Sequence, residues 1–361
     1  MQMRKCANVK KCKCEIVQMC KYKNEKITLI KVIKNNMKKG FEKFNFYLVQ
    51  LEKLLVAAAK SKNAALYLYE NDCRTKVFML QGLSKLYANM HNEKRFTKTK
   101  DAFKAIEDLL GAIDYYDNFY KDFLADKNIP EAIQKATLSK KVQSIADLNF
   151  LLEDKKWINS DKPKVEKIRK KLEKLDWQEE EKEIEGIKKV YEKSIASINK
   201  FYKETGTSFT DLETQIHEIR RKLRWLSIYP QALQGSIQYL SKIKADAKIK
   251  KYLTKEIVTS KYNVMPAVGN RTCILPIEKN YFLALSFVIN ALGNLKDKGL
   301  RIMAIAEAIE HTEFIKPELA LAKALKISKQ NPTAIKTILK EAKVICKQFF
   351  EEDNLGKLLG K

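Results

Sequence analysis

The chain has 361 residues, with 70 Lys and Arg against 44 Asp and Glu, and therefore a formal net charge of +26. This charge favours polyanionic partners, namely nucleic acid, polyphosphate, anionic lipid or an acidic protein. Residues 1–40 hold twelve Lys or Arg and two Glu, so the remaining 321 residues carry +16. Sparse Gly (11) and Pro (7) indicate mostly helix with short connections.

No segment fits a membrane span, a secretory signal or a disulfide framework. The longest nearly uncharged apolar run, 281–293, is too short to cross a bilayer. The N-terminus lacks a continuous apolar stretch before a small-residue cleavage site. Seven cysteines are an odd number, so we expect free thiols and a cytoplasmic location.

Residues 1–36 differ from the rest of the chain because they show neither helical nor strand periodicity. Cys6, Cys12, Cys14 and Cys20 crowd together among lysines, and four thiolates could in principle bind zinc. The spacing lacks the usual C-x2-C pairs, however. We therefore favour a disordered leader, or a mis-called start with translation beginning at Met37.

The sequence predicts an all-α fold with two antiparallel helical halves. The first half, 37–160, shows apolar residues at spacings of three and four. Four helices are predicted here, over 41–59, 64–90, 100–124 and 130–154. Pro130 is expected in the first turn of the fourth helix.

Residues 161–205 indicate a charged helical hairpin. Apolar positions alternate by three and four over 163–204, a spacing typical of packed antiparallel helices. The acidic run Glu179–Glu181 lies near the expected turn. Such a run is more often a solvated face than a metal site.

The second half, 206–350, begins after a break at 205–208. Thr210 or Asp211 can cap the next helix, which is expected to reach Tyr229, where Pro230 kinks or ends it, and to resume until about Ala247. Residues 253–280 read as an irregular or hairpin insertion. Helix returns over 279–350 in at least three segments, with starts at Pro317 and Pro332, and 351–361 is expected as a C-terminal tail.

The most informative stretch is 216–226. In a helix its cationic residues share one stripe, and an apolar face adjoins it; the stripe is His217, Arg220, Arg221 and Arg224, and the face is Ile216, Ile219, Leu223 and Leu226. Arginine offers a planar fork of donors that suits phosphate oxygens. The stripe is therefore either an anion site or a solvated face paired with acids on a neighbouring helix.

Two segments echo each other across the halves, which suggests an internal repeat. Leu110-Gly111 and Leu292-Gly293 both lie in apolar helices, and both follow a basic helix, which carries Arg74 and Lys76 in the first half and the arginine stripe in the second. A glycine inside a helix costs about 1 kcal/mol relative to alanine. We expect two sites of close helix approach, unless the echo is a coincidence in a leucine-rich chain.

These motifs resemble the CHAD family of α-helical, histidine-containing domains. That family combines a helix with His-x-x-Arg, a basic stretch ending Leu-Arg-aromatic, and a later Leu-Gly-x-x-Arg/Asn-Asp element, and it has the set twice. Here His217-x-x-Arg220, Lys222–Trp225 and Leu292–Asp297 are similar to these elements. The resemblance implies two bundles about a pseudo-twofold with a basic groove between them. It also implies binding of inorganic polyphosphate without turnover.

The chain departs from the family pattern in three ways. The opening and closing parts are about one turn too close, so Thr214 takes the histidine position if Arg224-Trp225 is the anchor. In the first half Asn71 replaces the histidine, and 77–80 lack basic residues. The first glycine is followed by Asp114-Tyr115 instead of Arg-Asp.

We expect a non-catalytic protein that binds polyanions, above all inorganic polyphosphate, with no cofactor and no metal. Arginines would supply bidentate contacts, and His217 would tighten binding on acidification. Counterion release would make affinity fall with salt. The candidate binding residues are His217, Arg220, Arg221, Lys222, Arg224, Arg271, Lys296, Arg74 and Lys76.

Nucleic-acid binding and a scaffold role stay open as alternatives. The first shares the charge argument but lacks zinc-finger spacing, an RNP-like strand or a compact helix-turn-helix. The second would need an exposed apolar stripe on the 163–204 hairpin. Catalysis is least supported, because three histidines offer little general-base chemistry. His311 is expected at a partly exposed helix end rather than as a metal ligand.

Overall fold

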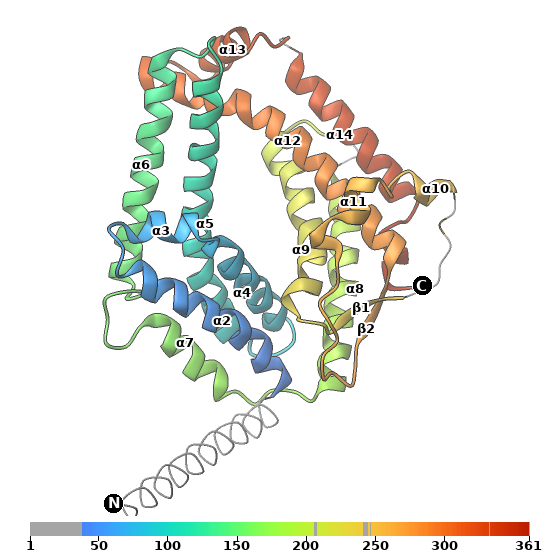
Figure 1. The fold of residues 1–361 in the computed structure, drawn as a ribbon. Helices are drawn as coiled ribbons and strands as arrows, with labels where there is room; N and C mark the ends of the chain where they lie inside the picture. Colours follow the sequence, from blue (N-terminus) through green and yellow to red (C-terminus); the bar gives the residue numbers. More distant parts are fainter. Residues whose placement is uncertain (1–37, 206–207, 241–244, 246, 332, 361) are drawn as a thin grey trace, which may run out of the picture.

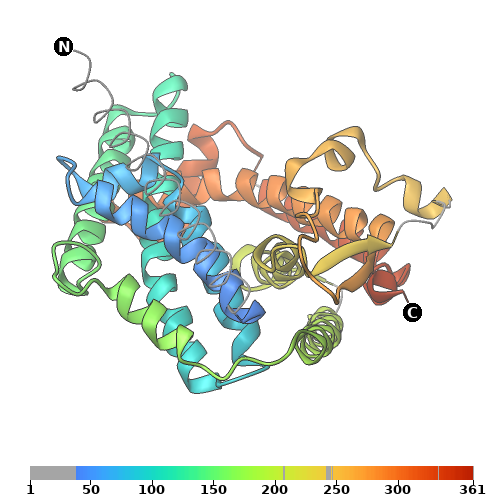
Figure 2. The same cartoon turned by 60° about the horizontal axis from the view of Figure 1, so that its bottom comes forward.

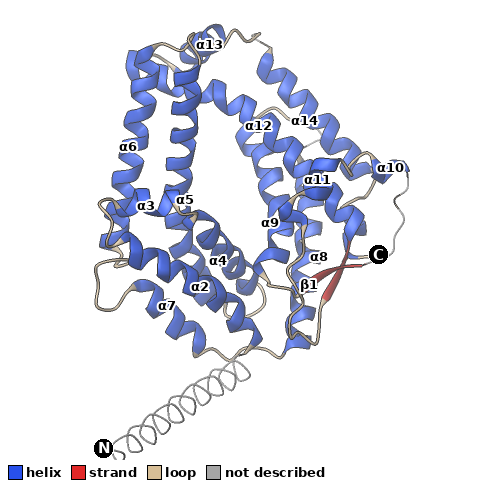
Figure 3. Cartoon of the chain, viewed as in Figure 1, coloured by secondary structure: helices blue, strands red, loops and turns tan. Residues whose placement is uncertain are grey.

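The computed structural model describes residues 38–205, 208–240, 245, 247–331 and 333–360. Regular structure in these ranges is helical except for two strands of four residues each (Figure 3). The predicted mostly helical class is therefore confirmed. The zinc and leader hypotheses for 1–36 lie outside the described residues.

The first half forms five helices where four were predicted. They are α2 (Lys39–Ala58), α3 (Ala64–Glu70), α4 (Cys73–Ala88), α5 (Glu93–Ala125) and α6 (Glu131–Asp154). The helix expected over 64–90 is interrupted because Asp72 adopts a left-handed conformation with φ of 54°. Pro130 directly precedes α6 as its N-cap.

The predicted hairpin over 163–204 is wrong as an arrangement, although both helices exist. Helix α7 (Lys164–Glu173) packs on α2, whereas α8 (Glu180–Glu204) packs on α9 (Figure 1). A spacing of three and four shows that a helix has an apolar face but does not show which neighbour covers it. The acidic run is not simply solvated either, since Glu180 accepts hydrogen bonds from Thr272.

The second half begins with one turn of π-helix, η1 (Leu212–His217), which Asp211 caps as expected. It continues through α9 (Glu218–Ala232), β1 (Ile237–Leu240), α10 (Ala247–Lys250), α11 (Lys255–Thr259), η2 (Lys261–Asn263), β2 (Leu275–Glu278), α12 (Lys279–Glu313), α13 (Pro317–Ile327), α14 (Ala334–Glu351) and η3 (Gly356–Leu359). At least three helices were predicted over 279–350, and α12, α13 and α14 lie there. Pro317 starts α13 as predicted, whereas Pro332, the other predicted start, lies outside the described residues.

The helix predicted to resume after Pro230 is not formed. Helix α9 continues only to Ala232, and the chain then turns through Gly235, whose φ is 90°. Strand β1 follows and pairs with β2 in parallel, with Ile237 opposite Leu275. The two strands of a β-hairpin are antiparallel, so the insertion near 253–280 is not a hairpin but the irregular segment that was the other expectation. It consists of short helices, loop and strand β2, whose partner β1 lies outside the insertion.

One hydrophobic core extends from Phe41 to Leu358 and includes residues of both halves and of α8. The last residues are not a free tail, because Leu355 and Leu358 are buried in this core. A second cluster joins Phe123 and Ile133 to the C-terminal part of α12 and to α13. The described chain is thus one packed unit rather than separate domains.

The two halves lie on opposite sides of the molecule and touch through α4 with α9 and through α6 with α12 (Figure 1). In the turned view the helices up to α7, blue to green, occupy one side, and the elements after 208, yellow to red, the other (Figure 2). A pseudo-twofold relation between the halves stays a prediction.

Candidate anion-binding site

Three of the predicted arginines line one cavity between the halves. The cavity has a volume of about 640 Å³ and is walled by α3 and α4, α5, α9, α11 with η2, and α12. Arg74 enters it from α4, and Arg220 and Arg224 enter it from α9. Since α4 and α9 pack side by side, cationic groups 150 residues apart in sequence converge on one space.

Arg220 is held against the backbone of α12 at the glycine noted in the sequence. An alanine Cβ at Gly293 would lie 3.1 Å from Nε and from Nη2 of Arg220. Nε of Arg220 donates to the backbone oxygen of Ile289, four residues before this glycine, at 3.0 Å. Gly293 thus makes room for a guanidinium group, not for a neighbouring helix backbone.

Arg74 repeats this arrangement in the first half. Its Nη2 lies 2.9 Å from the position of a Cβ at Gly111. Its Nε donates to Glu107, again four residues before the glycine, at 3.1 Å, and its Nη1 donates to Asp114 at 2.7 Å. The sequence echo between the two glycines therefore corresponds to two matching arginine–glycine contacts.

Arg224 has no carboxylate within ion-pair distance in the described part of the chain. Its guanidinium carbon lies 4.5 Å from the centre of the Phe78 ring, and its side chain is exposed to the cavity. Burial of the guanidinium group, together with repulsion from Arg220 and Arg74, lowers the pKa of Arg224 to about 10. Arg224 remains protonated at neutral pH, and its like-charged neighbours destabilise it.

Four carboxylates line the cavity beside its three arginines, and their partners differ from one wall to another. Glu107 and Asp114 neutralise Arg74, and Asp72 pairs with Lys76 at 2.7 Å. Glu256 accepts a hydrogen bond from Asn290. None of these acids forms an ion pair with Arg220 or Arg224 among the described residues, so the two α9 arginines are the cationic groups of the lining without a salt bridge.

His217 and Lys296 belong to the same positive cluster but do not line the cavity. Burial lowers the pKa of Lys296, and Arg220 and Arg224 contribute repulsion. Burial likewise lowers the pKa of His217, with Lys296 and Arg220 adding to the effect against Glu213. His217 is therefore neutral at physiological pH, and the expected charge switch lies at more acidic pH than the sequence suggested.

Arg221 of the stripe and the adjacent Lys222 do not line the cavity. Arg221 pairs with Glu218 at 2.5 Å, and Lys222 lies 3.4 Å from the same carboxylate. The predicted stripe is therefore divided, with Arg220 and Arg224 facing the cavity. Its apolar face is as predicted, because Ile216, Ile219, Leu223 and Leu226 are fully buried.

Arg271 is not placed to bind a polyanion. Its side chain is only 6% exposed, its Nε donates to the backbone oxygen of Gln234 at 2.8 Å, and Glu180 lies 3.8 Å from its Nη1. Next to it, Glu183 accepts hydrogen bonds from Lys43 and Tyr87 in the buried core. Arg271 is therefore a buried side chain that contacts Gln234 and Glu180, and it is not available to a ligand.

An aromatic pair between α4 and α9 was missed in the sequence. Phe78 stacks on Trp225 with ring centres 5.1 Å apart, and Lys85 Nζ lies 4.6 Å from the centre of the Trp225 ring. Phe78 follows Arg74 by four residues and Lys85 follows Phe78 by seven. Helical periodicity alone would have placed the three on one face.

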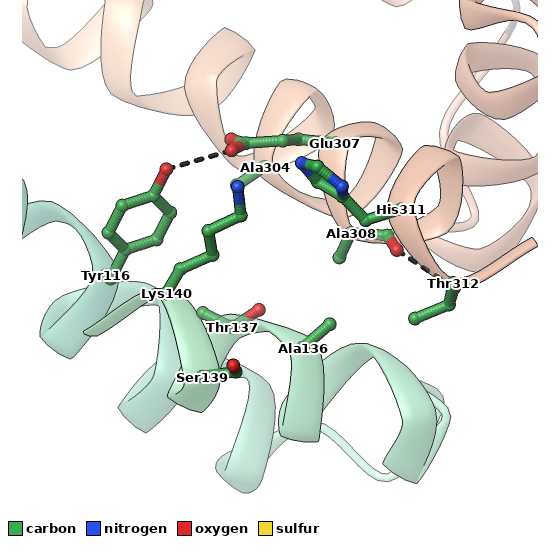
Figure 4. Close-up of a pocket in the computed structure, with 10 residues that line it drawn as sticks. All are labelled: Tyr116, Ala136, Thr137, Ser139, Lys140, Ala304, Glu307, Ala308, His311 and Thr312. Atoms are coloured by element: carbon green, nitrogen blue, oxygen red, sulfur yellow. Dashed lines mark hydrogen bonds between the residues drawn. The ribbon is translucent and has the colours of Figure 1, made fainter. Parts of the chain in front are cut away.

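A further cavity of about 230 Å³ lies where α5 and α6 meet α12 (Figure 4). Lys140 and Glu307 point into it near His311, and Tyr116 donates a hydrogen bond to Glu307 at 2.8 Å. His311 is exposed in the last turns of α12, as expected. One lysine and one glutamate balance here, and this cavity contains none of the predicted arginines.

No family model matches the chain, and no match was found among curated proteins or among solved structures. The resemblance to the CHAD family therefore rests on the sequence motifs and stays a prediction. None of the helices in the described ranges combines the length and the apolar character that a membrane crossing requires.

Proposed function

We propose that the chain binds phosphate-rich polyanions, above all inorganic polyphosphate, in the cavity between its halves, without turnover and in the cytoplasm. One observation carries the proposal. Arg220 and Arg224 converge with Arg74 on a cavity of about 640 Å³, and neither α9 arginine has a carboxylate partner among the described residues. Like charges held together inside a cavity are stabilised by an anionic ligand.

The two arginines would play different parts in binding. Arg220 is fixed by Gly293 and the Ile289 carbonyl, so its remaining donors are oriented before a ligand arrives. Arg224 rests on Phe78 without any hydrogen-bond acceptor in the described chain, so its whole donor fork is free for phosphate oxygens. Asn290 in the cavity wall donates one amide N–H to Glu256 and keeps a second one as an additional donor.

Nucleic acid is the second candidate because Tyr262, 68% exposed, also lines the cavity. An exposed aromatic ring beside arginines suits a stacked base. A scaffold role has less support. The large apolar side chains that stay well exposed in the described chain lie outside α7 and α8, so these helices offer no apolar stripe to a partner.

The test is a titration of the full chain with long-chain polyphosphate and with single-stranded DNA of equal charge, at low and physiological salt. The variants are Arg220→Met and Arg224→Met, with Arg221→Met as the matched control that removes the same charge from the same helix. We expect the first two to weaken polyphosphate binding by about tenfold or more, since a charge-assisted hydrogen bond contributes about 1.5–3 kcal/mol.

Arg221→Met should stay within about twofold, because one exposed charge contributes little at physiological salt. Equal losses in all three variants would mean generic attraction to a basic surface and would contradict the proposal. Stronger binding of DNA, lost in Tyr262→Leu, would favour the nucleic-acid alternative.

A further inference from the structure

A third cavity, about 280 Å³ in volume, lies on the other side of the Phe78–Trp225 pair between α4, α8 and α9. Phe78 lines the arginine cavity, whereas Trp225 lines this one, so the aromatic pair separates the two spaces. The cavity is lined by Lys85, Asn89, Val190, Lys193, Ser194, Ser197, Ile198, Lys222, Trp225 and Tyr229.

The charge of this lining is entirely positive. Lys85, Lys193 and Lys222 come from three different helices, and no Asp or Glu is among the lining residues. Lys85 and Lys193 have no carboxylate within ion-pair distance in the described part of the chain, whereas Lys222 lies 3.4 Å from Glu218. Two serines and an asparagine add neutral donors.

We propose that this lysine pocket is a second anion site, which takes a small phosphate-class oxyanion such as inorganic pyrophosphate. Compact ammonium groups act as point charges and do not demand the planar geometry of a guanidinium fork. Trp225 already contacts Phe78 and Lys85 through its ring, so the pocket lacks a free aromatic face for a nucleobase. The site goes beyond the polyanion cavity and does not depend on it.

The surroundings of Lys85 support this assignment. Burial lowers the pKa of Lys85 to about 8; Arg221 and Lys222 on α9 and Lys100 on α5 add repulsion, and Glu218 opposes it. Lys193 faces the same pocket from α8. A bound oxyanion would supply the missing countercharge and raise the pKa of Lys85 again. Binding near pH 8 should therefore be accompanied by proton uptake.

The test is calorimetric titration of the full chain with inorganic pyrophosphate, using Lys85→Met and Lys193→Met. Methionine keeps the unbranched shape of each side chain, one heavy atom shorter, and removes its charge. Lys188→Met is the matched control, because Lys188 is an exposed lysine of the same helix as Lys193 but lies outside the pocket. Arg224→Met controls for binding in the arginine cavity.

We expect saturable binding that weakens by about tenfold in each pocket variant and stays within about twofold in Lys188→Met, while Arg224→Met reports on any pyrophosphate that binds in the arginine cavity. Repeating the titration near pH 8 in buffers of different ionisation enthalpy should show proton uptake that Lys85→Met abolishes. Lys193 is exposed, so its variant tests the site even if Lys85→Met fails to fold.

Absence of saturable binding, or an equal loss in Lys188→Met, would overturn the proposal. So would a loss confined to Arg224→Met, which would place pyrophosphate in the arginine cavity. That last outcome would leave the proposed function intact. Conversely, failure of polyphosphate to respond to Arg224→Met would leave the lysine pocket untouched, so the two failures are distinguishable.

Discussion

Arg220 lies where it does because residue 293 has no side chain. A guanidinium group is broad and flat, and on α12 it rests on the helix backbone, with Nε donating to Ile289 one turn earlier. Placed there, it faces the cavity without a carboxylate partner. A helix accepts the cost of an interior glycine, about 1 kcal/mol, when the space is needed for packing or function.

Gly293→Ala should therefore separate stability from binding. A Cβ would lie 3.1 Å from two nitrogens of Arg220, so the guanidinium must shift by a few tenths of an ångström. We expect an unchanged or higher melting temperature, because alanine is the better helix former, and polyphosphate affinity lowered by about fivefold, or about 1 kcal/mol.

Gly186→Ala on α8 is the control for this experiment. Its Cβ would meet Met90 at an ordinary 3.4 Å and would not approach the arginine cavity. Thermal melts and polyphosphate titrations on both variants measure the two effects. Unchanged affinity in Gly293→Ala would show that the position of Arg220 does not determine binding.

At the scale of elements, the π-turn η1 holds His217 beside a cluster of positive charge. Nδ1 of His217 is buried without a hydrogen-bond partner, and Oε2 of Glu213 is 3.8 Å away. Burial together with Lys296 and Arg220 lowers the pKa of His217 below its ordinary value of 6.5. π-turns are often found at functional sites, and here the turn carries the residue that precedes the arginines.

This arrangement predicts a pH-dependent stability. Below about pH 6.5 the unfolded chain binds a proton at His217 that the folded chain resists, so the free energy of unfolding falls as pH decreases toward the lowered folded pKa. His217→Gln removes this contribution. Urea unfolding at pH 7 and pH 5 should show a smaller loss of stability in His217→Gln than in the wild type.

His311→Gln is the control, because His311 is exposed at the far end of α12. It should lose as much stability on acidification as the wild type. If His217→Gln lost just as much, acid sensitivity would come from the carboxylates alone.

The sequence predicts helices well where one apolar face repeats without interruption, as in α2, α5 and α12. It misses the break at Asp72, because a left-handed residue inside a helical pattern leaves the periodicity intact on both sides. It misses β1, because four residues are too short for a period. Of the site, Arg74, Arg220 and Arg224 were predicted and do line one cavity, whereas Arg271 was misplaced.

What the sequence could not supply is the pairing of elements. Periodicity identifies the buried face of α8 but not that α9 covers it, and it places Lys85 and Lys193 on separate helices without indicating that they share a pocket. Such contacts arise from tertiary packing, which depends on all elements together. The lysine pocket could therefore be found only in three dimensions.

At the scale of the molecule, the two halves share one core. Trp157 in the first half, Trp177, which packs on Phe44 and Tyr87 of that half, and Leu355 and Leu358 near the C-terminus belong to the same cluster of buried side chains. The arginine cavity lies between halves that are held together by this core and by the second cluster on α12. Its geometry should persist only while the whole unit is folded.

Leu358→Ala tests whether the chain unfolds as one unit. Leu358 is fully buried, so its truncation should cost about 2–5 kcal/mol, and the loss should reach the first half as well. In a Trp225→Phe background the remaining tryptophans, Trp157 and Trp177, report on the side of the first half. We expect the unfolding midpoints from far-ultraviolet circular dichroism and from this tryptophan fluorescence to fall together.

Leu319→Ala, at a side chain that is 57% exposed on α13, should leave both midpoints almost unchanged. If the fluorescence midpoint stayed in place while the dichroism transition split, the halves would unfold independently. The cavity would then depend on docking of two folded halves, and polyphosphate binding should stabilise the interface rather than either half. Coincident transitions would instead mean that any core mutation, however distant, weakens the cavity by lowering the population of the single folded state.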